Sequence, residues 1–378
     1  MYLDNAATTR VIKEVGQVAA PFAHDNFYNA SAIYEKGLES KKALDNVRDI
    51  IKKQLRVTGG DVVFTSGATE SNNLAILGSV RNKKEKYIFS AGEHPSVYYV
   101  AKRLEELGQE VVFVGLTKFG SVDLSKLEAV LDENVRLISI IHVSNETGAI
   151  NDLKAISKLK EKKCKDAFLH VDGSQAFCKI QTNLAGLAVD YYSMSGHKIH
   201  ATKGVGALYI KNKAKLKNIN YGGGQEYGLR SGTEPVPAIV GFGHAVSISS
   251  VETALPMVQV VHDRAVEILK ADGVKIQCMD SDMQTHSPYI VSASFLGVNG
   301  ETLVHACSAK EIYISRGSAC SSKQVGNRVL EAVGIGKNDI ASSVRISFNR
   351  LDNLGEVLVA IKEIVATYKE ILWKLKKQ

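Results

Sequence analysis

The chain has 378 residues, of which 45% are hydrophobic and 23% are charged, and its formal net charge is +7 at pH 7. This composition is typical of a soluble globular protein, and the length favours one large domain with a smaller second one. The lysines are dispersed rather than gathered into a stripe, so a nucleic-acid partner is not indicated.

The N-terminus, MYLDNAATTR, lacks a basic and then apolar signal pattern. No run approaches the roughly 18 apolar residues that a membrane-spanning helix needs, and we therefore expect a cytoplasmic protein. The cysteines show neither CxxC nor Cys/His metal spacing, which predicts no disulfide framework and no metal site. Their odd number leaves room for one reactive thiol among Cys164, Cys178, Cys278, Cys307 and Cys320.

An irregular lead-in, Asp4–Thr9, opens the chain, and an amphipathic helix is predicted over residues 38–57. From Asp61 onward, short apolar runs alternate with helical patterns, which predicts an α/β fold with a mostly parallel, seven-stranded sheet between helices. Ligands in such folds bind beyond the carboxyl ends of the strands. The runs are VVFT, YIFS, VVFV, LISIIHV, FLHV, YYSM and GVGALYI.

The pattern changes near Pro256 to that of an α+β domain. The segments SPYIVSASF and SVRISF are predicted strands, and a closing helix is predicted over Leu354–Lys377. We place a large α/β domain at residues 15–255 and a small α+β domain at residues 1–14 and 256–378.

Lys198 follows the predicted strand around Tyr191–Met194, in what reads as a tight polar turn between two strands. A lysine near the end of a buried strand can lose its proton by desolvation, and a neutral amine can condense with an aldehyde such as pyridoxal 5'-phosphate (PLP). The alternative is an ordinary surface lysine. Partners for such a cofactor elsewhere in the chain decide between the two interpretations.

The first partner is the segment TSGATESNN at residues 65–73, between an apolar strand and an apolar helix. Backbone N–H groups at a helix N-terminus suit a phosphate, although a plain Ser/Thr cap explains the same residues. His94, Asn145 and Asp172 each follow a predicted strand. His94 suits stacking or proton transfer, Asn145 a polar contact, and Asp172 the pyridine nitrogen of PLP, with Gln175 reaching its ring hydroxyl. Each has a structural alternative, but their common position after strands favours one site.

In this order, the motifs resemble those of the cysteine desulfurases of the class V aminotransferase family, which are fold type I PLP enzymes. The resemblance covers essentially the whole chain, and it makes the large domain the PLP-binding one and the small domain the carrier of the catalytic cysteine. The matching stretches are YLDNAATT, TSGATESNN, EHPSV, SNETGAI, HVDGSQ, SGHK, GGGQE with LRSGTE, SRGSAC and VRISF.

The resemblance implies Lys198 as the Schiff-base lysine, His94 stacked on the PLP ring, and a homodimer in which Thr233 reaches the partner subunit's cofactor. Asn145 and Arg345 are expected to hold the substrate carboxylate, where a guanidinium offers a bidentate fork. The cofactor-binding residues implied are Ala68, Thr69, His94, Asn145, Asp172, Gln175, Ser195, Gly196, His197, Lys198 and Thr233.

Cys320 lies in the segment SRGSACSSK, where small polar neighbours expose the thiol and Arg316 and Lys323 favour the thiolate. The resemblance implies that Cys320 takes the sulfur of L-cysteine as a persulfide, leaves L-alanine, and passes the sulfur to an acceptor protein in iron–sulfur cluster assembly or tRNA thiolation. The expected catalytic residues are thus Cys320, Lys198 and His94.

The chain departs from the family pattern at residues 28–34, Ala201–Thr202 and Asn349, and the segment after Cys320, SSKQVGNRVL, is slightly short. They affect the expected shape of the substrate entrance and the choice of acceptor, and they remove no chemical group. A selenocysteine lyase or cysteine sulfinate-type lyase on the same scaffold is the nearest alternative, and retention of Cys320 argues for desulfuration. A catalytically idle scaffold subunit is disfavoured by the intact Lys198 and Asp172, and a plain aminotransferase has no reason for SRGSAC.

Overall fold

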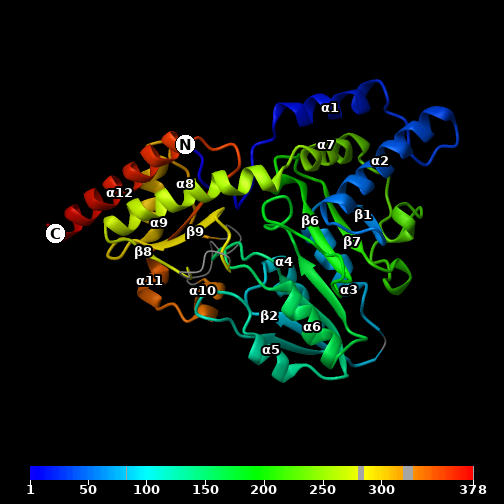
Figure 1. Cartoon of the computed structure of the whole chain (residues 1–378), viewed down its shortest axis with the longest axis horizontal. Coiled ribbons are helices and arrows are strands. Elements are labelled where there is room, and N and C mark those ends of the chain that lie inside the picture. Colours follow the sequence, from blue (N-terminus) through cyan, green and yellow to red (C-terminus); the bar gives the residue numbers. More distant parts are fainter. Residues whose placement is uncertain (82, 280–284, 318–326, 378) are drawn as a thin grey trace.

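A seven-stranded sheet forms the centre of the larger part of the molecule (Figure 1). The computed structural model describes residues 1–81, 83–279, 285–317 and 327–377. Strand β7 is antiparallel to both of its neighbours, and the remaining pairings are parallel, which confirms the predicted sheet. In spatial order the strands are β1 (Asp61–Thr65), β7 (Gly206–Ile210), β6 (Tyr191–Ser195), β5 (Phe168–Asp172), β4 (Val135–Ile141), β2 (Lys86–Ser90) and β3 (Glu110–Val114).

Both faces of this sheet are apolar. Alternate side chains of each strand point to opposite sides of the sheet, and the strands are apolar at both sets of positions. In β1, Val62 and Phe64 join one core cluster and Val63 joins the other. One cluster is covered by α1 (Lys13–His24), α2 (Glu35–Gln54), α5 (Leu124–Val130), α6 (Leu153–Lys163) and α7 (Val236–Ser247), and the other by α3 (Ala68–Leu77) and α4 (Pro95–Glu106).

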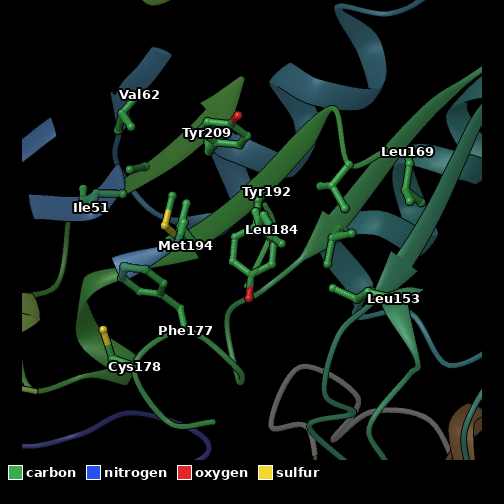
Figure 2. Close-up of a cluster of buried hydrophobic side chains, with 14 of the residues drawn as sticks. Ile51, Val62, Leu153, Leu169, Phe177, Cys178, Leu184, Tyr192, Met194 and Tyr209 are labelled. Carbon is green, nitrogen blue, oxygen red and sulfur yellow. The ribbon is translucent and has the colours of Figure 1, made fainter. Parts of the chain in front are cut away.

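Strand β6 lies inside the first of these clusters. Figure 2 shows Tyr192 and Met194 among the side chains of Phe177, Leu184 and Tyr209, which also belong to this cluster. The side chains of Tyr192 and Met194 are fully buried. The strand that leads to Lys198 is therefore held rigidly by its own packing.

The connection from β6 to β7 is longer than predicted. It runs over residues 196–205 and begins with the 3-10 turn η1 (Gly196–Lys198), so the tight turn expected from the sequence is wrong. The reason is packing: Ile199 and Ala201 are buried, and the backbone carbonyl of His197 accepts a hydrogen bond from the Thr9 backbone N–H at 2.9 Å.

A three-stranded antiparallel sheet organises the smaller part, with the strand order β10 (Ser343–Ser347), β9 (Ile290–Ser294) and β8 (Lys275–Ile276). Its hydrophobic core includes Leu3 and Ala6 from the N-terminal segment. The predicted closing helix is α12 (Leu354–Lys376). The remaining elements are α8 (Val251–Ala271), α9 (Gly300–Ser308), α10 (Arg328–Val333), α11 (Lys337–Ala341) and the 3-10 turns η2 (Lys213–Lys215) and η3 (Glu226–Gly228).

Helix α8 joins the two parts and extends from beside α7 across the small sheet (Figure 1). The proposed domain boundary at residues 255/256 falls inside this helix, and the core of the smaller part takes residues from Val258 onward. The boundary itself stays a prediction. Within the described ranges, no single helix is long and apolar enough to cross a membrane; the pair α7 and α8, bent by 74°, reaches that length and composition only jointly.

Candidate active site

A cavity of about 470 Å³ lies at the carboxyl ends of the strands of the large sheet. Its size is that of a small-molecule site. The lining includes the last residues of β4, β5 and β6 and the turn that precedes α3. Ten predicted site residues meet there: Ala68, Thr69, His94, Asn145, Asp172, Gln175, Ser195, His197, Lys198 and Arg345.

One end of the cavity is the N-terminus of α3. Gly67 precedes the helix and no side chain caps it, so the first backbone N–H groups, at Ala68 and Thr69, are available to a ligand. Strand β7 comes close behind this turn, since a Cβ atom at Gly206 would lie 2.6 Å from the Cα atom of Gly67. The arrangement offers an anion both N–H groups and the positive end of the helix dipole.

Asp172 ends β5 and is 2% exposed. Its Oδ2 accepts a hydrogen bond from Asn72 Nδ2 at 2.9 Å, and its Oδ1 accepts one from the Ser174 backbone N–H at 3.0 Å. These neutral donors hold the carboxylate in place without neutralising it. A negative group buried at the cavity wall favours a cationic ring nitrogen beside it.

His94 is the N-cap residue of α4, and its Nδ1 accepts a hydrogen bond from the Ser96 backbone N–H at 3.1 Å. Ser96 Oγ lies 2.8 Å from the same Nδ1 and accepts from Asn72 Nδ2 at 2.9 Å, so His94 and Asp172 share one network. Burial lowers the pKa of His94 below its ordinary value. The imidazole is therefore neutral at neutral pH, with its proton on Nε2.

Lys198 sits in the 3-10 turn after β6 and donates from Nζ to the carbonyl oxygens of Ala6 and Ala7, at 2.6 and 2.7 Å. The N-terminal segment thus closes one side of the cavity. His197 next to it bonds from Nδ1 to Thr8 Oγ1 at 3.1 Å, and burial together with nearby Lys198 lowers its pKa to about 4. A neutral His197 can act as a hydrogen-bond donor to a ligand in the cavity, which it lines.

Gln175 is held from two sides. Its Nε2 donates to the carbonyl oxygen of Ala6 at 2.8 Å, and its Oε1 accepts from Lys179 Nζ at 2.8 Å. Gln175 and Lys179 are 3% and 6% exposed. Lys179 was not among the predicted site residues.

Arg345 in β10 brings the small sheet to the cavity. Its Nη2 pairs with Asp4 Oδ1 at 2.9 Å, and its Nη1 donates to the carbonyl oxygen of Asn145 at 2.9 Å. Among the described residues, Arg345 Nε is buried without a hydrogen-bond partner. Arg345 lines the cavity together with Asn145, and its guanidinium suits a carboxylate ligand there.

Three predicted site residues are not part of the cavity lining. Gly196 is buried against Val205, and Thr233 is exposed outside the cavity. Cys320 lies outside the described residues. Sequence reasoning also missed Asp4, Asn72 and the carbonyl groups of Ala6 and Ala7. The stretches YLDNAATT and TSGATESNN contain all of them, but only the fold shows their contacts.

The other four cysteines are free and buried. Burial raises the pKa of Cys164 and Cys307 to about 11 and that of Cys278 to about 12, and it raises the pKa of Cys178 as well. A buried thiol with a raised pKa is a poor nucleophile. None of these four is suited to attack a substrate sulfur.

Comparisons with known proteins show the family of the chain. The sequence model of the family described as Aminotransferase class-V matches residues 1–358. A cysteine desulfurase IscS from Neisseria meningitidis serogroup C (strain 053442) is 35% identical over 388 residues, which cover 99% of this chain and 95% of that protein. A solved structure named NifS-like protein superposes with a TM-score of 0.90 at 32% identity, covering 97% of this chain and 98% of the other. A structure described as SspA in complex with cysteine superposes with a TM-score of 0.81 at 31% identity, covering 92% and 98%.

Proposed function

The chain belongs to the class-V aminotransferase family, and we propose that within it the protein is a PLP-dependent cysteine desulfurase that converts L-cysteine to L-alanine and passes the sulfur on as a persulfide of Cys320. The observation that carries the proposal is the convergence of four groups on one cavity. These are the open N-terminus of α3, the buried carboxylate of Asp172, the neutral imidazole of His94 and the amine of Lys198.

The residues present fit PLP. The N–H groups of Ala68 and Thr69 suit its phosphate, together with Ser195 and His197. The carboxylate of Asp172 suits its pyridine nitrogen, and the amine of Lys198 suits its aldehyde. When bound there, PLP draws electrons from the α-carbon of an amino acid and so weakens the bonds around it.

The side chains of the protein bind the substrate and transfer its protons. Arg345 and Asn145 hold the carboxylate of L-cysteine, because both line the cavity and a guanidinium suits a carboxylate. Lys198 removes the proton from the α-carbon. His94 presents Nε2–H to the cavity while Ser96 occupies Nδ1, so His94 holds or moves the proton at the substrate thiol.

Cys320 is the proposed sulfur acceptor. Its thiolate forms a bond to the substrate sulfur as the carbon–sulfur bond breaks, and the carbon skeleton takes up protons to become alanine. L-cysteine and one thiol thereby become L-alanine and one persulfide. The four buried cysteines support this assignment because none of them is suited to the attack.

The assembly around this reaction is also a proposal. Thr233 is exposed and away from its own cavity, which supports a homodimer in which it reaches the partner subunit's phosphate site. We place the protein in the cytoplasm, where reduced thiols persist, with an iron–sulfur scaffold or tRNA thiolation enzyme as acceptor.

The test compares alanine and sulfide formation from L-cysteine, with PLP and a reductant, in the parent, Cys320→Ala and Cys164→Ala. We expect Cys320→Ala to lose both products while it still binds PLP, and Cys164→Ala to keep them. If Cys320→Ala released alanine and sulfide at the parental rate, the role of this cysteine would be wrong. If the parent bound PLP but formed neither product, the substrate assignment would fail.

A further inference from the structure

Lys179 is a buried lysine directly behind the cavity. It lies in the turns that follow β5, four positions after Gln175, and only 6% of it is exposed. The strongest charges acting on it are the cations Lys198 and Arg345, and these together with the larger effect of burial lower its pKa to about 7. A buried lysine among cations lowers stability, and a methionine of similar length would pack there more favourably. Its presence therefore calls for another explanation.

The contact of Lys179 with Gln175 determines which way the Gln175 amide points. An ammonium or amine hydrogen of Lys179 faces Oε1 at 2.8 Å, and the carbonyl oxygen of Ala6 faces Nε2 at 2.8 Å. In the flipped orientation, oxygen would face oxygen and nitrogen would face nitrogen, which removes both hydrogen bonds. The amide is thus held with its nitrogen toward Ala6, and the second hydrogen of Nε2 remains for the cavity.

The same lysine lines a small cavity together with Lys198. This cavity, of about 10 Å³, is separate from the main one. The Nζ atom of Lys179 lies 5.7 Å from the ring centre of Tyr289. The charged and titratable groups that surround this space, or act on Lys179, are Lys198, Arg345, Arg350, Cys178, His200 and Tyr289.

We propose that Lys179 is a positioning residue of this site: it orients the Gln175 amide toward the cofactor and places a positive charge behind Lys198. The inference rests on the proposed function, since it assumes PLP joined to Lys198. In its charged form, Lys179 disfavours a proton on the nitrogen of Lys198, which keeps that nitrogen ready to react.

The test uses purified holoprotein of the parent and of Lys179→Met. The visible absorbance of bound PLP is measured as a function of pH. The readout is the midpoint pH, at which the absorbance lies halfway between its low-pH and high-pH values. We expect this midpoint to rise by about one pH unit in Lys179→Met, because a neighbouring positive charge has been removed. Thermal unfolding of the same variant should occur at the parental temperature or above it, since the variant no longer buries an amine.

Two further variants sharpen the result. Lys179→Gln still offers an N–H group to Gln175 but has no charge, and the midpoint should rise in it too. Lys160→Met is the matched control. Lys160, on α6, is likewise 6% exposed, but it pairs with Asp190 at 3.4 Å and lines neither the main cavity nor the small one. It should lose thermal stability and keep the parental midpoint.

An unchanged midpoint in both Lys179 variants would overturn the inference, as would a loss of stability with no change in the spectrum. A parent without a visible PLP band would contradict the proposed function, and the inference with it. A parent with the band that forms no alanine would refute only the proposed substrate, because the spectroscopic comparison would still decide the role of Lys179.

Discussion

The wall of the cavity and the interior of the small domain are both buried, but they are built from opposite kinds of residue. The small-domain core consists of apolar side chains such as Phe295 and Leu303, both 0% exposed. At the cavity, Asp172, Lys179 and Arg345 are 2%, 6% and 3% exposed. Apolar burial stabilises a fold, whereas buried charges generally do not. The difference indicates that the small-domain core carries stability and the cavity wall carries chemistry.

Lys198→Ala should produce the largest effect: it should remove activity and leave stability unchanged. Without this amine, PLP has no covalent attachment and the substrate α-proton has no base, so alanine formation should fall by at least about a thousandfold. The apoprotein should keep its unfolding midpoint. Alanine release and the visible spectrum after gel filtration measure the effect, and Lys211→Ala, an exposed lysine that directly follows β7 at the opposite edge of the sheet, is the control. Activity within tenfold of the parent would contradict the assignment.

Phe295→Ala should have the opposite effect: it should lower stability and leave activity unchanged. Phe295 packs edge-on against Tyr368 with ring centres 5.2 Å apart, and its truncation leaves a cavity in an apolar core. We expect the free energy of unfolding to fall by about 3–5 kcal/mol. Chemical denaturation gives this value, and alanine formation at low temperature should remain parental. If the turnover number of the folded enzyme also fell in this variant, the proposed division between a stabilising region and a chemical region would be wrong.

Acid should weaken the fold through its buried histidines. The pKa values of His142, His170, His200 and His286 are lowered to about 4, with burial as the main cause. Below pH 6.5 the unfolded chain takes up protons that the folded chain does not, so stability is complete above about pH 6.5 and is lost progressively down to about pH 4.

Each such histidine contributes a slope of about 1.4 kcal/mol per pH unit in this window. His142→Gln should flatten the pH dependence of chemical denaturation by one such slope. The exposed His305→Gln should leave it unchanged. A pH profile for His142→Gln that runs parallel to the parental one would refute this account.

Arg345→Lys should produce the smallest of these effects and should act on substrate binding. A lysine cannot reproduce the planar contacts to Asp4 and to the Asn145 carbonyl while offering a third N–H to the substrate. We expect KM for L-cysteine to rise about 10- to 100-fold with kcat changed less than about threefold. Arg264→Lys, an exposed surface change on α8, serves as control. A change in kcat alone would place Arg345 in the chemical step instead.

Much of the fold could be predicted because its signals are local. Apolar runs of strand length alternating with helical periodicity predicted every strand of the large sheet, and the apolar stripe of the last helix predicted α12 to within one residue. The prediction of a tight turn after β6 was wrong. The length of this connection depends on the burial of Ile199 and Ala201 and on the N-terminal segment that packs against the connection. No periodicity reports such a long-range contact.

The sequence by itself determined the chemical groups of the site and their places after the strands. Their order along the chain was sufficient to predict Lys198, Asp172 and His94, because parallel strands bring their carboxyl ends to one edge. Only the tertiary structure decided the partners of these groups. The hydrogen bonds of Lys198 to Ala6 and Ala7, and of Gln175 to Ala6, join segments that are far apart in the chain, and backbone carbonyl groups look alike in any sequence. Such contacts are set by packing in three dimensions, so their roles become readable only once the chain is folded.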